Sequence, residues 1–286
     1  MAIVMITGAN SGIGLATAVT LARGKHTVIA TMRDVGSAGE LQKIVSAEKL
    51  SVTVVSLNVD DDSSVSYAFS KVLAENGRID VLVNNAGVSG SGSVEELPMA
   101  VFREVMETNF FGALRCIEAV IPNMRERRHG SIVNVTSVAG RVALAPQAAY
   151  AASKWAFEAL SECLAQEMKA FNIRVAIIEP GVIATPIFTK TRPAPEDSPY
   201  PHLRRLRALF KASLIKPTSP YVVGEQIRQI IEGDSWQLRY PVGPDALPLL
   251  TWRASKTDEE IVSRGGANDA EYIANIKRDF GLDVAL

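Results

Sequence analysis

Two residues that could transfer a proton lie four positions apart near the middle of the chain, in the stretch Tyr150-Ala-Ala-Ser-Lys154. The surrounding sequence is rich in alanine and predicts a helix, in which side chains at this spacing lie on the same face. A free tyrosine has a pKa of about 10, and a nearby ammonium favours the phenolate. The pair could therefore combine a proton donor with the cation that tunes it. An ordinary solvated tyrosine and lysine would show the same spacing.

A glycine-rich stretch near the amino end could bind phosphates. The sequence Thr7-Gly-Ala-Asn-Ser-Gly-Ile-Gly14 follows an apolar, strand-like run and opens a segment with helical spacing. Glycines let the backbone turn tightly and approach a ligand, and the N–H groups at a helix start suit a pyrophosphate. Between a strand and a helix, this loop predicts a dinucleotide site, whereas alone it could be a structural turn. The loop residues that we expect at the cofactor are Gly8, Asn10, Ser11, Gly12, Ile13 and Gly14.

The elements that would position these residues alternate along the first two-thirds of the chain. The predicted strands are Ile3–Thr7, Thr27–Thr31, Val52–Val59, Val81–Val83, Ile132–Val135 and Arg174–Glu179. The predicted helices include Gly12–Ala22, Ser63–Glu75, Ala100–Arg127 and Ala148–Phe171. Short apolar strands separated by helices indicate a parallel sheet covered on both faces. We therefore predict an α/β fold, with a single Rossmann-like, doubly wound parallel sheet of about seven strands and helices on both faces.

The last third of the chain has a different pattern. Thr189–Pro201 is rich in proline and predicts a loop, and Leu203–Leu214 predicts a helix whose arginines, Arg205 among them, lie away from its leucine face. The remaining predicted elements are a helix at Pro220–Ile231, a strand at Leu238–Val242 and short surface helices at roughly 258–280. We interpret residues 1–286 as one domain, with an insertion at residues 186–217 and a helical extension at residues 244–286.

Composition excludes several kinds of partner. The net charge of −1 gives no reason to expect nucleic acid or an anionic membrane. The sequence has no basic leader that would predict a signal peptide, and no apolar run long enough to predict a membrane span. Cys116 and Cys163 lie among apolar neighbours, which favours reduced core thiols and a cytoplasmic protein. The three histidines show no ligand spacing, so we expect no metal site.

Six motifs, taken together and in this order, resemble those of the short-chain dehydrogenase/reductase family. The resemblance covers roughly residues 1–187, and the layout is similar to that of carbonyl reductases and of 17β-hydroxysteroid and retinol dehydrogenases. The motifs are the glycine loop, Asn84-Asn85-Ala86-Gly87, Asn109 in a Thr-Asn-Phe-Phe-Gly stretch, Ser137, the Tyr150/Lys154 pair and Pro180-Gly-Val-Ile-Ala-Thr185.

The resemblance implies a catalytic set of Asn109, Ser137, Tyr150 and Lys154. Tyr150 would exchange a proton with the substrate oxygen, while Lys154 would lower the pKa of that phenol and hold the ribose of the cofactor. The Ser137 hydroxyl can donate to the oxygen on which charge develops. The backbone carbonyl of Asn109 would hold a water that relays protons to Lys154. From sequence alone, Asn109 could equally mark a kink or a solvated position in its helix.

The resemblance also implies further cofactor contacts. Asn58 stands where the family usually has an aspartate, and its amide oxygen can accept the same hydrogen bond from adenine. Backbone groups near Val182 and the hydroxyl of Thr185 would hold the nicotinamide carboxamide. The implied contacts beyond the glycine loop are Asn58, Val59, Asn85, Ala86, Gly87, Tyr150, Lys154, Pro180, Gly181, Val182 and Thr185.

The end of the second predicted strand favours NADP over NAD. An acidic residue there would bind both ribose hydroxyls, whereas an arginine pairs with a 2′-phosphate. The sequence Ala30-Thr-Met-Arg33-Asp34 has no acid at the strand end and places Arg33 in the following loop, as in NADPH-dependent carbonyl reductases. NAD stays the alternative, because the glycine loop has no basic residue and Arg33 could be a solvated charge.

The expected reaction is hydride transfer between the cofactor and a secondary alcohol or ketone. The insertion at 186–217 lies where relatives carry a substrate lid, and its apolar residues suit a bulky, hydrophobic substrate. They are Ile187, Phe188, Tyr200, Leu203, Leu206 and Phe210. The two long helices resemble those that pair in homodimers or homotetramers of the family. A catalytically silent nucleotide-sensing module and a sugar-nucleotide epimerase are the alternatives.

Overall fold

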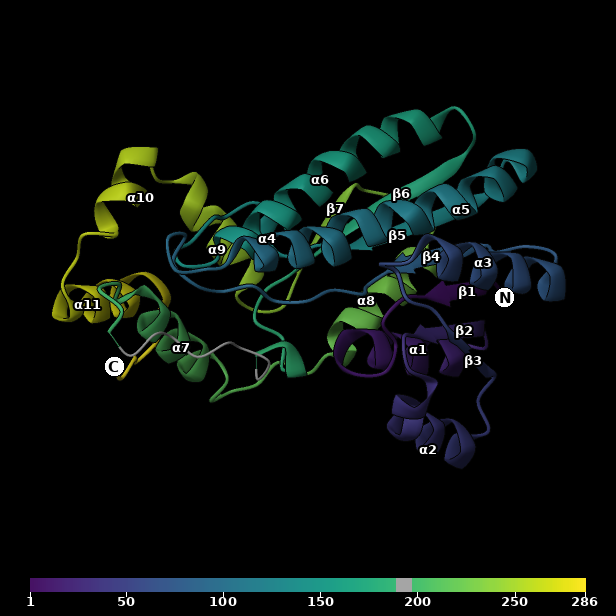
Figure 1. Ribbon diagram of the computed structural model, residues 1–286. Helices are drawn as coiled ribbons and strands as arrows, with labels where there is room; N and C mark the ends of the chain where they lie inside the picture. The colour runs from purple at the N-terminus through teal and green to yellow at the C-terminus, as the bar shows by residue number, and fades with distance from the viewer. Residues whose placement is uncertain (189–196) are drawn as a thin grey trace.

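A parallel sheet forms the centre of the computed structural model, which describes residues 1–188 and 197–286 (Figure 1). Its strands are β1 (Ile3–Ile6), β2 (Thr27–Met32), β3 (Val52–Ser56), β4 (Val81–Asn84), β5 (Gly130–Val135), β6 (Ile173–Pro180) and β7 (Arg239–Val242). They lie in the order β3-β2-β1-β4-β5-β6-β7, and all neighbours are parallel. The winding therefore reverses between β1 and β4, where doubly wound folds bind their ligands. The predicted sheet is confirmed.

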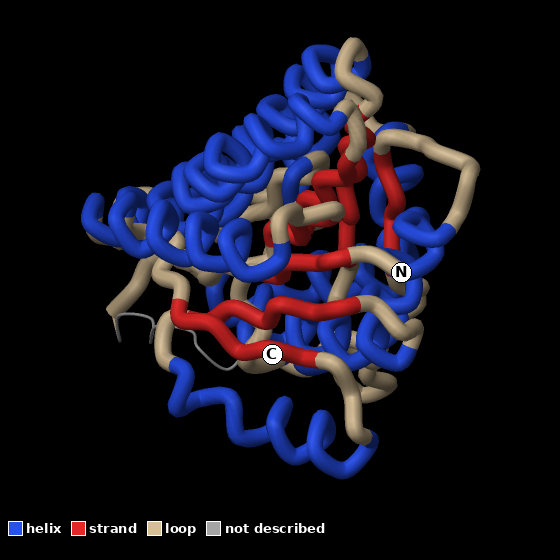
Figure 2. Tube along the Cα trace, turned by 90° about the vertical axis from the view of Figure 1, so that its right-hand side faces the viewer, coloured by secondary structure: helices blue, strands red, loops and turns tan. Residues whose placement is uncertain are grey.

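Alternating side chains of each strand enter two separate cores. In β1, Val4 and Ile6 belong to one buried cluster, and Met5 belongs to the other. The first cluster includes residues of α1 (Gly12–Arg23), α2 (Gly39–Glu48) and α8 (Tyr221–Glu232). The second includes residues of α3 (Asp62–Asn76), α5 (Gly112–Arg127) and α6 (Ala148–Lys169). Helices thus cover both faces of the sheet (Figure 2), which explains why its strands are apolar throughout.

The long helix predicted at Ala100–Arg127 is not continuous. The structure has α4 (Met99–Met106), then a π-helical segment, η2 (Glu107–Phe111), and then α5. A π-helical segment inserts extra backbone into a helix and is frequent at functional sites. It contains Asn109, which is buried. The apolar spacing of the sequence continues through the segment, so the pattern alone does not reveal it.

The carboxyl part of the chain supplies further helices beside the sheet. They are η4 (Pro186–Phe188), α7 (His202–Ser213), α9 (Ala246–Ala254), α10 (Asp258–Arg264) and α11 (Asp269–Phe280). α7 joins the extension through a small buried cluster of Ala212, Ile276 and Val284. The predicted loop at Thr189–Pro201 falls largely outside the described residues, which exclude 189–196. In the described part of the chain, every helix is too short or too polar to cross a membrane.

Two sequence expectations about side chains are wrong. Arg205 was expected on the wet face of its helix, but only 5% of its surface is exposed. Its guanidinium lies over the ring of Tyr272 and its Nε donates to Asp269 at 2.9 Å, which compensates the burial of the charge. Cys163 was expected in the core and is exposed, whereas Cys116 is buried as expected. Cys163 lies on the outer face of α6, where local apolar neighbours do not imply burial.

Candidate active site

Tyr150, Lys154 and Ser137 meet at the carboxyl end of β5. Tyr150 and Lys154 lie one turn apart near the start of α6, and the Lys154 Nζ is 5.7 Å from the centre of the Tyr150 ring. Ser137 follows β5 and begins a short 3₁₀ turn, η3 (Val138–Gly140), where its hydroxyl accepts a hydrogen bond from the Ala139 N–H. The Ser137 hydroxyl is near enough to the Tyr150 phenol to lower the pKa of that phenol. The three predicted residues are therefore close enough to act on one oxygen atom.

Lys154 is buried and carries a perturbed pKa. Its Nζ donates to the carbonyl oxygen of Val135, the last residue of β5, at 3.0 Å. Burial lowers the pKa of Lys154 to about 8, and the nearby carboxylate of Glu158 opposes this change. A lysine that titrates near neutrality in a buried position is typical of functional sites.

Lys154 was expected to lower the pKa of Tyr150, but in the protein without a bound cofactor the pKa of Tyr150 is raised. Burial raises the pKa of Tyr150 above its ordinary value, and the Ser137 hydroxyl only partly offsets this effect. The protein therefore keeps the phenol protonated across neutral pH. A protonated phenol beside a polarised oxygen is suited to donate a proton, which is the role required when a ketone is reduced.

Asn109 links the loop after β4 to α6. Its Oδ1 accepts from the Val88 N–H at 2.8 Å, and its Nδ2 donates to the Val88 carbonyl and to the Ser153 hydroxyl, both at 3.0 Å. Ser153 in turn donates to the Tyr150 carbonyl at 2.7 Å. The side chain of Asn109 thus fixes the helix that carries Tyr150 and Lys154. Its role through a backbone-bound water stays a prediction.

The glycine loop and the loop after β4 pack tightly against each other. The Thr7 hydroxyl accepts from the N–H groups of Asn85 and Ala86, at 2.9 and 3.0 Å. The side-chain amide of Asn85 donates to the Thr7 and Gly8 carbonyls, at 2.9 and 3.0 Å. These two hydrogen bonds from the Asn85 side chain therefore hold the backbone of the glycine loop in place. A Cβ on Gly14 would lie 2.2 Å from the Gly8 carbonyl oxygen, so this position requires glycine.

The amino end of α1 suits a bound pyrophosphate. α1 begins at Gly12, which has φ +56°, and the preceding Ser11 makes no side-chain hydrogen bond to the helix. The first N–H groups of a helix have no partner within it, so here they stay available to an anion. Asn10, Ser11, Gly12 and Ile13 are partly exposed at this end. The backbone of the loop therefore fits a dinucleotide.

The residues expected at the adenosine lie at the ends of β2 and β3. Arg33 directly follows β2 and is exposed, and the Asp34 carboxylate accepts from the Gly36 N–H at 2.8 Å as the cap of a 3₁₀ turn, η1 (Val35–Ala38). Asp34 is thus engaged with its own turn. Asn58 lies beyond the end of β3, which stops earlier than predicted, and Val59 is buried against Gly112.

The loop after β6 lies beside the glycine loop. A Cβ on Gly12 would be 3.1 Å from the Thr185 side chain, so the two loops are in close contact. Pro180 ends β6 and the Gly181 N–H donates to the Val242 carbonyl at 2.9 Å. The Val182 N–H is taken by the Asp245 carboxylate at 2.8 Å. Its carbonyl, and not its N–H, is therefore left for the expected contact with a carboxamide.

Sequence reasoning missed two residues that support this site. Glu158 lies one turn beyond Lys154, is 4% exposed, and accepts from the Thr136 hydroxyl at 2.6 Å. Ser153 precedes Lys154 and is fully buried. The spacing of Glu158 from Lys154 was a visible signal, because residues four apart share a helix face.

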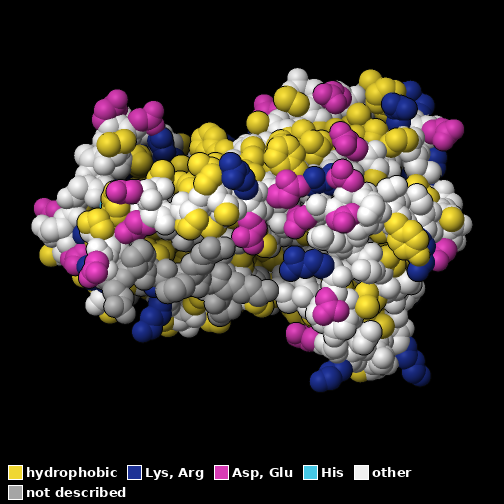
Figure 3. Space-filling view, viewed as in Figure 1, with side chains coloured by type: hydrophobic (Ala, Val, Ile, Leu, Met, Phe, Trp, Pro, Cys, Tyr) yellow, Lys and Arg dark blue, Asp and Glu magenta, His cyan; other side chains and the backbone are white. Residues whose placement is uncertain are grey.

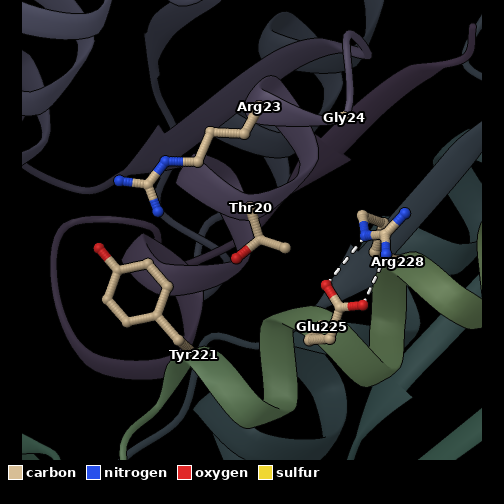
Figure 4. A pocket seen from close by; sticks show the side chains of 6 residues that line it. All are labelled: Thr20, Arg23, Gly24, Tyr221, Glu225 and Arg228. Carbon is tan, nitrogen blue, oxygen red and sulfur yellow. Dashed lines mark hydrogen bonds and ion pairs between the residues drawn. The ribbon is translucent and has the colours of Figure 1, made fainter.

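A second pocket lies outside the candidate active site. An open pocket between α1 and α8 is lined by Arg23, Tyr221 and Arg228 (Figure 4), but Arg23 pairs with Glu48 and Arg228 with Glu225. This pocket does not contain any residue of the candidate site. Within residues 1–188 and 197–286, no group of three or more histidine, cysteine or acidic residues could hold a metal ion.

Comparisons with known proteins agree with this geometry. Residues 2–196 match a family model described as short chain dehydrogenase. A crystal structure of a short-chain dehydrogenase from Streptomyces avermitilis superposes with a TM-score of 0.80 and 37% identity, over 93% of this chain and 98% of that one. The 3-ketodihydrosphingosine reductase of Bacteroides thetaiotaomicron is 35% identical over 85% of this chain and 88% of its own length.

Retinol dehydrogenase 8 from Bos taurus is 44% identical over 187 residues, which are 64% of this chain. This match spans only 59% of the length of that relative. The fold and the matches together define the Rossmann-like sheet of short-chain dehydrogenases. The chain belongs to the short-chain dehydrogenase family, as the motifs indicated.

Proposed function

We propose that the protein transfers a hydride between NADPH and a bulky, hydrophobic secondary alcohol or ketone. The observation that carries this proposal is the convergence of Tyr150, Ser137 and Lys154 at the carboxyl end of β5, next to a glycine loop that fits a dinucleotide. The nicotinamide supplies the hydride, and the protein supplies the proton and the orientation.

In the proposed reaction, Tyr150 donates its phenolic proton to the substrate oxygen as the ketone is reduced. Ser137 donates a hydrogen bond to the same oxygen and stabilises the charge that develops there. Lys154 holds the ribose of the cofactor and supplies positive charge near the phenol. In the reverse direction, the Tyr150 phenolate would accept the proton of the alcohol.

The choice of NADP rests on Arg33. Its guanidinium is exposed directly after β2, and the nearest acidic residue, Asp34, is engaged in capping η1. Neither Thr31 nor Met32 at the end of β2 can bind the ribose hydroxyls as a carboxylate would. An exposed arginine at this place favours a 2′-phosphate, because guanidinium and phosphate form paired hydrogen bonds.

The substrate class rests on α7 and the residues before it. Phe188 contacts Phe210 edge to face, with ring centres 4.8 Å apart, and Leu203 and Leu206 of α7 are buried. Two relatives carry names that specify an alcohol, retinol, and a ketone, 3-ketodihydrosphingosine. An apolar wall of this kind suits such a substrate, and we propose that it faces the catalytic residues.

The two helices flanking the site also suit pairing of two copies. Hydrophobic side chains gather over α4 to α6 on the face shown in Figure 3. Trp155 on α6 and Phe111 in η2 are 49% and 43% exposed, and burial of large apolar side chains like these would favour association. We therefore propose a homodimer or homotetramer built on these helices.

A panel of carbonyl substrates tests the proposed function. The purified protein should oxidise NADPH, followed at the absorbance band of the reduced nicotinamide, when a steroid, retinoid, quinone or long-chain ketone is added. Preference for the smallest aliphatic carbonyls would count against the apolar wall. Absence of NADPH binding and turnover with every substrate would instead support a function without redox chemistry.

A further inference from the structure

Asp245 holds the loop after β6 from a distant part of the sequence. Its Oδ2 accepts a hydrogen bond from the Val182 N–H at 2.8 Å, although the two residues are 63 positions apart. Asp245 stands at the start of α9, where an aspartate usually accepts a hydrogen bond from its own helix. Here its side chain makes no such bond. The carboxylate is therefore directed at the loop and not at the helix that it begins.

Two glycines make room for this carboxylate. A Cβ on Gly181 would lie 2.2 Å from the Asp245 Oδ1, and a Cβ on Gly243 would lie 3.2 Å from the same atom. Gly243 also has φ +106°, a conformation that favours glycine. Oδ1 is buried and has no hydrogen-bond partner among the described residues. An unpaired buried acceptor is costly, and such costs are usually tolerated at functional sites.

The same loop is fixed on its other side. The Ala184 N–H donates to the Thr218 carbonyl at 2.9 Å, and Ile183 pairs with Thr218 as an isolated bridge. Thr218 comes after α7, and Asp245 begins the carboxyl-terminal extension. The loop from Gly181 to Thr185 is thus held between two segments outside the six sequence motifs. Thr185, at its far end, lies against Gly12 of the glycine loop.

We propose that Asp245 is a positioning residue that fixes the Gly181–Thr185 loop over the nicotinamide half of the cofactor. The proposal rests on the proposed cofactor site. Because Asp245 binds the Val182 N–H, it sets the direction of the Val182 carbonyl and the place of Thr185, which are the groups expected at the carboxamide. The extension thereby contributes to cofactor binding without touching the adenosine half.

The test compares two ligands that share the adenosine end. NADPH contains the nicotinamide, whereas adenosine 2′,5′-bisphosphate lacks it. Loss of the partly buried hydrogen bond should make Asp245→Ala bind NADPH roughly tenfold more weakly. Its affinity for adenosine 2′,5′-bisphosphate should stay that of the wild type. Equilibrium titration of the intact protein, followed by intrinsic fluorescence, measures both affinities without requiring turnover.

Three further variants sharpen the test. Asp245→Asn keeps an oxygen that can accept the Val182 N–H, so it should bind NADPH nearly as the wild type does. Gly181→Ala keeps the carboxylate but pushes a methyl group against it, so it should weaken NADPH binding in the same selective manner. Thr257→Ala removes the cap of α10 within the same extension, so it controls for general loosening and should leave both affinities unchanged.

The outcomes separate this inference from the proposed function. Wild-type affinity of Asp245→Ala for NADPH would overturn the inference, as would an equal loss for both ligands, which would indicate general damage. A wild-type protein that binds neither ligand would overturn the cofactor site itself. Selective loss for NADPH, restored in Asp245→Asn, would establish the positioning role.

Discussion

The carboxylate of Glu158 lies one helical turn beyond Lys154 and opposes the lowering of the lysine pKa by burial. Glu158 is itself buried and is held by the Thr136 hydroxyl at 2.6 Å and by Arg239 at 3.0 Å. Burial and the charge of Glu179 raise the pKa of Glu158. The two hydrogen bonds act in the opposite direction, because they stabilise the charged carboxylate. The lysine therefore has one buried counter-charge on its own helix.

Replacement of Glu158 should move the pH profile of ketone reduction. The ammonium of Lys154 is lost as the pH rises through its pKa of about 8, so wild-type kcat/KM should fall above that pH. Without the carboxylate, the charged lysine is less stable and its pKa falls further. In Glu158→Gln, the alkaline limb of the kcat/KM profile should therefore lie roughly one pH unit lower.

Glu162→Gln is the matched control for this profile. Glu162 lies one turn further along α6 and binds the same Arg239 at 2.5 Å, but it is exposed and makes no contribution to the pKa of Lys154. The surrounding charges Arg141, Arg239 and Glu179, on neighbouring elements, are unchanged in both variants. An unshifted profile in Glu158→Gln, or the same shift in Glu162→Gln, would contradict this account.

Tyr150→Phe should abolish most of the turnover. The variant keeps the ring and removes the proton, and a positioned acid typically contributes 10²–10⁴-fold to the rate, so kcat should fall by about that factor. The affinity for NADPH should change little. Stopped assays of product, with NADPH binding measured in parallel, check both quantities. Substantial turnover without the phenol would remove Tyr150 from the mechanism.

The sequence was sufficient to predict those elements and contacts that depend on residues close together in the chain. Strands β1 to β6 were predictable because each is an apolar run between helical segments, and Tyr150 and Lys154 were predictable because one helical turn joins them. The interrupted helix at Asn109 was not, because apolar spacing continues through η2 without a glycine or proline before it ends. The spacing of apolar residues does not indicate whether the backbone there forms α-helical or π-helical hydrogen bonds.

Long-range partners were beyond the reach of the sequence pattern. Arg205 appeared to be on the wet face of its helix, because its partner Asp269 is 64 positions away in the extension. Asp245 was not singled out in the sequence, because its partner Val182 is 63 positions away. In both cases the tertiary fold brings a charged side chain to a partner that no spacing rule connects.

Arg33→Ala should change the choice of cofactor. If the guanidinium pairs with the 2′-phosphate, its removal should weaken NADPH binding roughly tenfold and leave NADH binding unchanged. Adenosine 2′,5′-bisphosphate should lose affinity to the same degree as NADPH, in contrast to the effect of Asp245→Ala. Titration with all three ligands checks this, and an equal loss for NADH would show that Arg33 does not select the phosphate.

Trp155→Glu should dissociate the proposed oligomer. A charge buried at a helix-paired interface without a partner opposes association. Sedimentation of the variant at micromolar concentration should give the mass of a monomer, 30.8 kDa, where the wild type gives a multiple of it. Val262→Glu, at an equally apolar position that is 76% exposed on α10, is the control and should not change the mass.

Gly14→Ala should destabilise the fold through the glycine loop. The added Cβ would lie 2.2 Å from the Gly8 carbonyl oxygen and 2.5 Å from the Asn85 amide nitrogen, so both must move. Overpacking of this kind costs about 1–3 kcal/mol of unfolding free energy. Gly39→Ala, at the start of α2 with no atom within 4 Å of the new Cβ, is the matched control. Thermal unfolding should show a lower midpoint for Gly14→Ala and an equal or higher one for Gly39→Ala, since alanine favours a helix where it fits.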